Sequence, residues 1–194
     1  MLEIKNETLD RLLTDYNLTE APLSEGLQLL ADKDHRYLKD LRINLNNALA
    51  YQNLTRKESY LLALAVAINE KHENVKLAFT QLAATEGATP EEITELHALV
   101  SLMNVNNIFY RFRHFTNKEY YNNTPAGIKM SIMMNPVLGK EFFELASLAI
   151  SAVNGCEMCV NAHEESVLKH GATEARIYDA IRLTAVVKGF INLM

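Results

Sequence analysis

Apolar residues recur along most of the chain at the three- and four-residue spacing of an amphipathic α-helix. One such pattern begins at Leu9, and leucines continue it between residues 27 and 49. Two denser apolar runs, over 61–68 and 145–153, are too short to cross a bilayer and indicate buried helices. No segment sustains the alternation that is typical of a strand. We therefore predict an all-α protein.

Two helix starts are marked by capping residues. Thr55 is followed three residues later by Glu58, which is the signature of a capping box, and the helix it opens is expected to run to about Asn69. Thr89 precedes Pro90, and this order is typical of an N-cap followed by the first helical position. Both positions predict where a helix begins.

The chain contains a weak internal repeat. Gly87–Ala88–Thr89 recurs as Gly171–Ala172–Thr173, an offset of 84 residues (171 minus 87), and the apolar positions on either side keep the same phase. The segment 117–135 is rich in helix breakers and separates the two copies. We predict one all-helical domain built from two degenerate repeats. Its expected parts are an N-terminal helical extension over 1–36 and repeat halves over 37–116 and 126–194.

Four chemically active positions occur in the second half alone. They are Glu144, Cys156, Cys159 and His163. At the offset of 84 residues their counterparts in the first half are Tyr60, His72, Val75 and Phe79. A shared scaffold explains the repeated apolar positions but does not explain these four. We take them as the candidate site.

The cysteines are predicted to start a helix, because Asn154–Gly155 ends the preceding one. A helix N-terminus offers free N–H groups and partial positive charge, which stabilise a thiolate and lower the pKa of a thiol. Their spacing of three puts both sulfurs on one turn, so a disulfide can close and reopen. His163 follows Cys159 by four residues, on the same face, where it is positioned to exchange a proton with the thiol.

Glu144 is expected to reach this site across a helical hairpin. If the chain reverses at Asn154–Gly155, Glu144 and His163 lie at heights that differ by only about 3 Å. Glu144 also falls inside the apolar run 142–146. A carboxylate in such surroundings is costly unless it is paired, so a partner is expected.

Simpler interpretations remain open for these residues. The cysteines are either a redox pair, half of a metal site or inert core, and a metal site requires further ligands from His163, His170 or Glu144. Taken alone, Glu144 is an acid on a helix face and His163 is a surface or hydrogen-bonded histidine. We favour redox chemistry, with no metal and no bound cofactor.

Charge and composition narrow the function further. The 194 residues carry a formal net charge of −5, which gives no general attraction to nucleic acid or anionic lipid. The N-terminus lacks the apolar core of a signal peptide, and the only two cysteines are a close pair, which favours a reducing compartment. We expect a cytoplasmic protein with no membrane and no nucleic-acid partner.

The complete pattern Glu-x11-Cys-x2-Cys-x3-His resembles the alkyl hydroperoxidase D (AhpD) family, within the carboxymuconolactone decarboxylase-like superfamily. The stretches 103–111 and 130–136 are also similar to segments of that family, so the resemblance extends from about Tyr37 to the C-terminus. One position departs from it. The family often has His immediately before the second cysteine, where this chain has Met158. Any proton-transfer role of that His is lost, and slower turnover is expected.

The resemblance implies an antioxidant thiol peroxidase that reduces alkyl hydroperoxides and assembles as a homotrimer. It implies Cys159 as the attacking thiol that forms the sulfenic acid, Cys156 as proton donor and resolving thiol in a Cys156–Cys159 disulfide, and Glu144 with His163 as a proton relay. Electrons are expected from dihydrolipoamide on a lipoylated 2-oxoacid dehydrogenase acyltransferase, recharged by dihydrolipoamide dehydrogenase. The peroxiredoxin AhpC is a further expected partner.

Three other functions compete with this one. A protein disulfide-exchange adaptor shares the thiols but has little direct peroxidase activity. A superfamily decarboxylase acting on a cyclic lactone acid needs no cysteine pair. A plain oligomerisation module leaves Glu144 in its apolar run unexplained.

Overall fold

The structure is a computed structural model that describes residues 6–194, so the first five residues of the predicted N-terminal extension lie outside the described residues. Helices account for all regular secondary structure in the described part, which confirms the all-α prediction. The elements are α1 (Glu7–Asp15), α2 (Glu25–Asp32), α3 (Tyr37–Ala48), α4 (Arg56–Asn69), α5 (Glu73–Thr85), α6 (Pro90–Thr116), α7 (Glu119–Asn123), a 3-10 turn η1 (Ser131–Met133), α8 (Lys140–Val153), α9 (Glu157–Lys169) and α10 (Glu174–Ile191).

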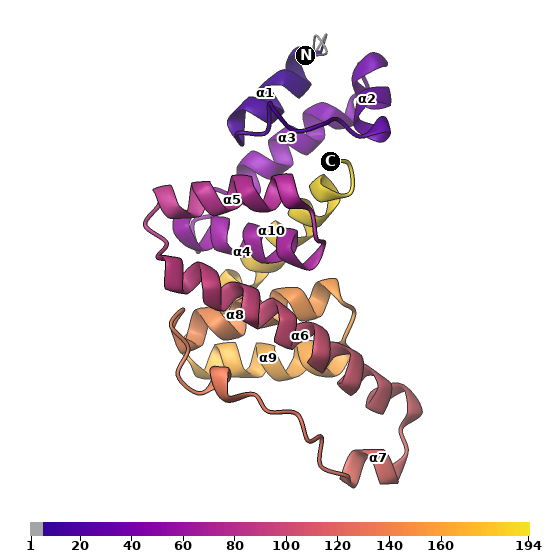
Figure 1. The fold of residues 1–194 in the computed structure, drawn as a ribbon, viewed down its shortest axis with the longest axis vertical. Helices are drawn as coiled ribbons and strands as arrows, with labels where there is room; N and C mark the ends of the chain where they lie inside the picture. Colours follow the sequence, from indigo (N-terminus) through magenta and orange to yellow (C-terminus); the bar gives the residue numbers. More distant parts are fainter. Residues whose placement is uncertain (1–5) are drawn as a thin grey trace.

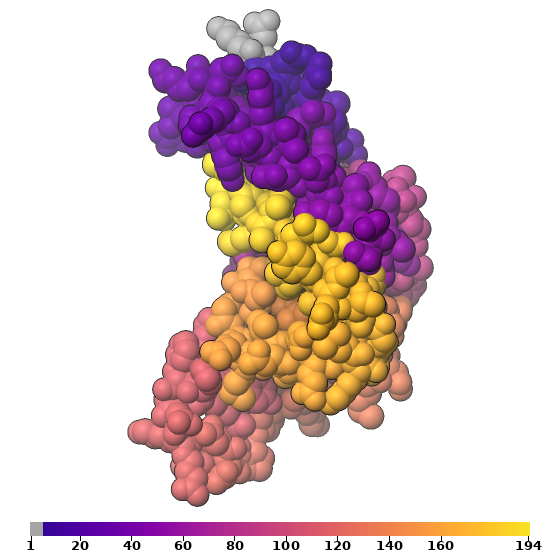
Figure 2. Space-filling model, turned by 180° about the vertical axis from the view of Figure 1, so that it is seen from behind, coloured from indigo at the N-terminus to yellow at the C-terminus, as the bar shows by residue number. Residues whose placement is uncertain are grey.

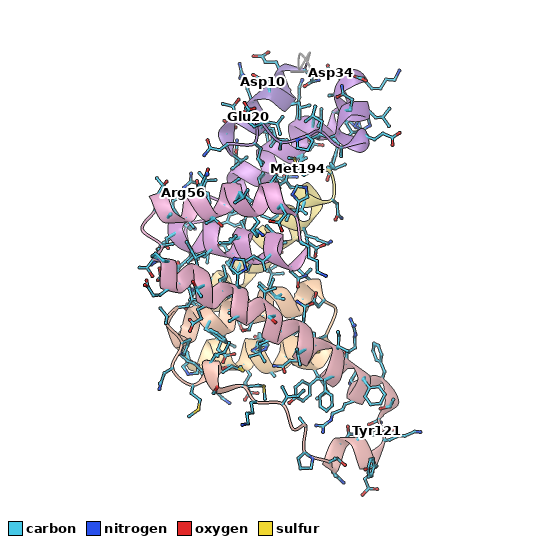
Figure 3. The ribbon with its side chains drawn as sticks, viewed as in Figure 1. Asp10, Glu20, Asp34, Arg56, Tyr121 and Met194 are labelled. Carbon is cyan, nitrogen blue, oxygen red and sulfur yellow. A yellow bond between two sulfur atoms is a disulfide. The ribbon has the colours of Figure 1, made fainter. Side chains whose placement is uncertain are left out.

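The helices form an elongated stack (Figure 1). The N-terminal helices α1 to α3 lie at one end, α4, α5 and α10 form the middle, and α6, α8 and α9 follow. The far end of α6 projects with α7, where Tyr121 is labelled, and the C-terminal Met194 lies near the N-terminal helices (Figure 3). Seen from behind, α10 is exposed between the N-terminal helices and the rest of the second half (Figure 2).

Both predicted helix starts are confirmed. The Glu58 backbone N–H donates to Thr55 Oγ1 (3.2 Å), and the Thr55 N–H donates to a Glu58 carboxylate oxygen (2.8 Å). The same reciprocal box joins Thr89 and Glu92 at the start of α6, with Pro90 as the first helical residue. These bonds satisfy backbone donors that a helix start leaves free.

The helix bounds follow the repeat offset. A shift of 84 residues carries α4 onto α8 and α5 onto α9, and it carries the first residue of α6 onto the first residue of α10. An ion pair is also repeated with its charges exchanged. Lys57 Nζ lies 2.7 Å from Glu92 Oε1, and the corresponding positions hold a Glu141–Arg176 pair at 2.8 Å. These correspondences support the repeat, while the division into the proposed halves remains a prediction.

The second half is built around α8. Every residue from Phe142 to Ser151 is buried, including the charged Glu144. A helix that is apolar all round requires neighbours on every side, and α8 packs against α4, α6, α9 and α10. Glu144 therefore lies in the interior of the protein, on a helix that packs beside α9.

Candidate active site

The turn between α8 and α9 places the cysteines. Gly155 has a φ of 67°, a left-handed conformation that glycine adopts without steric cost. The Cys156 backbone N–H donates to Ser151 O (3.1 Å), and α9 begins at Glu157 with Cys156 as its N-cap residue. The chain thus reverses where the sequence predicts, and both cysteines lie at the N-terminus of a 13-residue helix.

Cys156 and Cys159 are joined in a disulfide, with their Cα atoms 5.3 Å apart. The two sulfurs differ in access. Cys156 is completely buried, whereas Cys159 keeps 6% of its surface exposed and lines a pocket. A reagent in this pocket therefore meets Cys159 first.

Glu144 and His163 meet beneath the pocket. Glu144 Oε2 lies 2.7 Å from His163 Nδ1, and both side chains are buried. The contact joins the middle of α8 to the middle of α9, as the hairpin geometry predicts. Since Nδ1 is engaged, Nε2 is the nitrogen left for chemistry, and the His163 ring lines the same pocket as Cys159.

A second partner of Glu144 was not foreseen from the sequence. Lys140 Nζ lies 2.8 Å from Glu144 Oε1 and also donates to Met133 O (2.7 Å). The signal for this pair was its i, i+4 spacing on one helix face. Lys140 therefore links α8 to the irregular segment that precedes it.

These contacts fix the charge of Glu144. Burial by itself raises the pKa of a carboxyl group, but the hydrogen bonds from His163 and Lys140 outweigh it and lower the pKa of Glu144 to about 2. Glu144 is therefore ionised at neutral pH. Such a group is suited to holding and stabilising a protonated imidazole, and it is a poor acceptor of the proton itself.

The pocket has a volume of about 240 Å³. Side chains from α6, from the segment around η1 and from α9 line it: Asn106, Tyr110, Met130, Met133, Met158, Cys159, Ala162 and His163. Three methionines give it an adaptable apolar wall. The pocket accordingly suits an apolar ligand that presents a reactive group to Cys159.

Polar contacts hold the cysteine turn against α6. Asn107 Nδ2 donates to Ser151 Oγ (2.9 Å), and Asn154 Nδ2 donates to Asn107 Oδ1 (2.9 Å). Arg111 Nη1 donates to Asn154 O (2.5 Å). Asn107 and Arg111 belong to the stretch 103–111, whose sequence alone did not predict a role at the site. The structure shows that they anchor the turn that carries the thiols.

The first half holds an unreactive counterpart of the site. Tyr60 and Phe79, which correspond to Glu144 and His163, pack with ring centroids 6.2 Å apart. His72, the counterpart of Cys156, caps α5 by accepting the Val75 N–H (3.3 Å). The same hairpin therefore supports an aromatic contact in one half and a carboxylate–imidazole hydrogen bond in the other.

No group of three His, Cys, Asp or Glu side chains within residues 6–194 is arranged to hold a metal ion. His170, one of the ligands considered above, has its Nδ1 2.8 Å from Ser166 O. Within the same residues, no helix has the length and apolar character needed to cross a membrane.

Fold and site together define an all-helical protein with a disulfide between closely spaced cysteines and a buried acid–imidazole pair. Residues 121–194 match the Carboxymuconolactone decarboxylase family. The chain is 33% identical over 163 residues to "Alkyl hydroperoxide reductase AhpD" of Rhodopseudomonas palustris, covering 84% of this chain and 90% of the relative. It is 37% identical over 149 residues to the AhpD of Anaeromyxobacter dehalogenans, covering 77% and 80%. The chain belongs to the AhpD family.

A solved structure shares the fold. A Burkholderia xenovorans protein described as a gamma-carboxymuconolactone decarboxylase subunit superposes with a TM-score of 0.65 at 15% identity, over 96% of this chain and 94% of that chain. At this identity the likeness bears on the fold alone.

Proposed function

We propose that this protein is a thiol peroxidase that reduces alkyl hydroperoxides through a dithiol/disulfide cycle of Cys156 and Cys159. One observation carries the proposal: Cys159 and His163 line a single pocket, and His163 is hydrogen-bonded to the ionised Glu144. The names of the AhpD relatives, which are alkyl hydroperoxide reductases, support it.

Activation begins with a proton transfer. Glu144 accepts the hydrogen bond from His163 Nδ1–H, which leaves Nε2 to take the proton of the Cys159 thiol. The carboxylate stabilises the resulting imidazolium, and the N–H groups at the start of α9 stabilise the thiolate. In this scheme His163 carries the proton and Glu144 positions and stabilises it.

The thiolate of Cys159 then attacks the terminal oxygen of the hydroperoxide. The S–O bond forms as the O–O bond breaks, giving a sulfenic acid on Cys159 and an alkoxide that takes the Cys156 proton and leaves as an alcohol. The Cys156 thiolate attacks the Cys159 sulfur and expels hydroxide, which His163 protonates to water. The net reaction consumes two thiols and one hydroperoxide, and it yields a disulfide, an alcohol and water.

A dithiol closes the cycle by exchange at the accessible sulfur of Cys159, with Cys156 as the leaving thiol. We propose dihydrolipoamide, carried on a lipoylated acyltransferase and recharged by dihydrolipoamide dehydrogenase, because the apolar pocket suits a lipoyl chain as well as an alkyl hydroperoxide. The oxidised peroxiredoxin AhpC is a second substrate in this proposal. The cycle is proposed to operate in the reducing cytoplasm.

The test is a pair of serine variants assayed for lipoamide-dependent reduction of cumene hydroperoxide. Cys159→Ser is expected to lose the activity completely, because the attacking sulfur is gone. Cys156→Ser is expected to form a sulfenic acid that a trapping reagent labels on Cys159, without forming a disulfide. Full activity of Cys159→Ser would refute the cycle.

The exposed Met158 favours a second candidate, disulfide exchange with a protein. This side chain is 42% exposed between the two cysteines, where a docking protein could contact it. An adaptor of this kind exchanges rapidly with the peroxiredoxin and turns over cumene hydroperoxide at a negligible rate. Measuring both rates on one preparation separates the two functions. A superfamily decarboxylase needs no cysteine pair, so that function does not explain the disulfide.

A further inference from the structure

We propose that Asn106 binds and orients the substrate by accepting a hydrogen bond from the terminal O–H of the hydroperoxide. The inference rests on the proposed peroxidase function and assigns the group that orients the substrate in it.

Asn106 combines an unpaired acceptor oxygen with a side chain that lines the pocket. The side chain comes from α6, is only 4% exposed and lines the pocket together with Cys159 and His163. Its Oδ1 is buried and has no hydrogen-bond partner among the described residues. Buried polar atoms are normally paired, so an orphaned acceptor at a pocket indicates that a ligand supplies the donor.

A contact with Met130 identifies which end of the amide is free. Asn106 Nδ2 lies 3.3 Å from Met130 Sδ, and a thioether sulfur acts only as a weak acceptor. The amide NH2 group therefore belongs on the Met130 side. Oδ1 is left to accept a hydrogen bond from a ligand.

The hydroperoxide group has the matching donor. Its one O–H lies on the terminal oxygen, which is the oxygen that the Cys159 thiolate attacks. When the S–O bond forms and the O–O bond breaks, that hydrogen stays on the transferred oxygen and becomes the S–OH hydrogen of the sulfenic acid. The alkoxide leaves with the Cys156 proton. Asn106 Oδ1 is thus paired before and after the transfer, and it aligns the O–O bond with the sulfur.

The decisive variant is Asn106→Leu, which keeps a similar volume and removes the acceptor. Asn44→Leu, on the exposed face of α3, is the matched control. Three rates are measured for each protein: oxidation of the reduced protein by cumene hydroperoxide, its alkylation by iodoacetamide, which has no O–H group, and reduction of its disulfide by dihydrolipoamide. Asn106→Leu is expected to lose about tenfold in the first rate, the effect of one hydrogen bond, and to keep the other two. Asn44→Leu is expected to keep all three.

Three results would overturn this assignment. An equal loss with iodoacetamide would mean that Asn106 acts on the thiol or on the local structure, and a loss confined to dihydrolipoamide would make it a contact for the reductant. An unchanged rate of oxidation by cumene hydroperoxide would mean that Asn106 does not orient the hydroperoxide. Asn106→Asp is a second variant that keeps an acceptor oxygen and can be used even if Asn106→Leu does not fold. The ratio of its oxidation rate with cumene hydroperoxide to its alkylation rate with iodoacetamide should stay near the wild-type ratio. A wild-type protein that does not react with peroxide would refute the proposed function itself.

Discussion

At the scale of single residues, the site depends on a carboxylate that is held at both oxygens. Lys140 binds Oε1 of Glu144 and His163 binds Oε2, so the charge is compensated although the group is buried. Removing one partner from a buried charge costs far more than breaking a similar pair on the surface. The chain offers both cases with the same i, i+4 spacing, because Lys169 pairs with the exposed Glu165 on α9.

Lys140→Met is expected to raise the pKa of Glu144 and to destabilise the protein by about 2 kcal/mol at neutral pH. In the wild type the pKa of Glu144 is lowered from 4.5 to about 2. Its contribution to stability is therefore complete above pH 4.5 and is lost as the pH falls toward 2. In the variant this loss should be smaller and should occur at higher pH.

Urea unfolding between pH 7 and pH 2 measures the effect, with Lys169→Met as the control. Exposed pairs contribute little, so the control should follow the wild-type profile. Identical profiles for Lys140→Met and the wild type would mean that Lys140 does not hold the Glu144 charge.

At the scale of elements, capping residues fix where helices begin, and the cap of α6 matters for the site. This 27-residue helix supplies Asn106 to the pocket and Arg111 to the cysteine turn. Its start depends on Thr89, whose hydroxyl accepts the Glu92 N–H (3.2 Å).

Thr89→Ala is expected to lower the free energy of unfolding by about 1 kcal/mol, because the first turn of α6 loses its cap. Thr94→Ala is the matched control: Thr94 lies one turn further on, and its hydroxyl donates to Pro90 O (2.7 Å) inside the helix. Alanine has the higher helix propensity there, so the control should be neutral or slightly stabilising. Urea denaturation at pH 7 measures both, and equal losses would show that the capping bond is not the cause.

Local sequence rules accounted for the helices and for the meeting of Glu144 with His163, because capping and apolar phase act within one or two turns. They did not account for the pocket. Met130 and Met133 come from the irregular segment before α8, whose path is set by remote contacts. There the Glu95 carboxylate accepts the backbone N–H groups of Val137 (2.9 Å) and Leu138 (2.8 Å). No local pattern predicts which distant carboxylate meets those donors.

At the scale of the whole molecule, the projecting part of α6 leaves an apolar stripe uncovered. We define this α6 stripe as Val105, Ile108, Phe112 and Phe115, which follow one another at helical spacing and are 45–74% exposed. Such a stripe favours burial against another surface, as in a coiled coil. In the homotrimer that the family resemblance implies, copies of this chain would cover it.

Phe115→Glu is expected to shift the protein from trimer toward monomer, because a carboxylate in a buried apolar contact is costly. Light scattering after gel filtration measures the mass. Leu77→Glu is the control, since Leu77 is 57% exposed on α5, away from the α6 stripe, and its substitution should leave the mass unchanged. A monomeric wild type would contradict the assembly.

The exchanged charges of the two repeated ion pairs affect which helices of the two similar halves pair with one another during folding. Two halves with the same apolar phase present interchangeable partners during folding. If α4 took the place of α8 beside α10, Lys57 would meet Arg176, and in the reciprocal error Glu141 would meet Glu92. Each mismatch sets like charges together, which disfavours it. The inversion therefore disfavours an exchange of α4 and α8, while in the native fold Arg176 pairs with both Glu141 of α8 and Glu58 of α4.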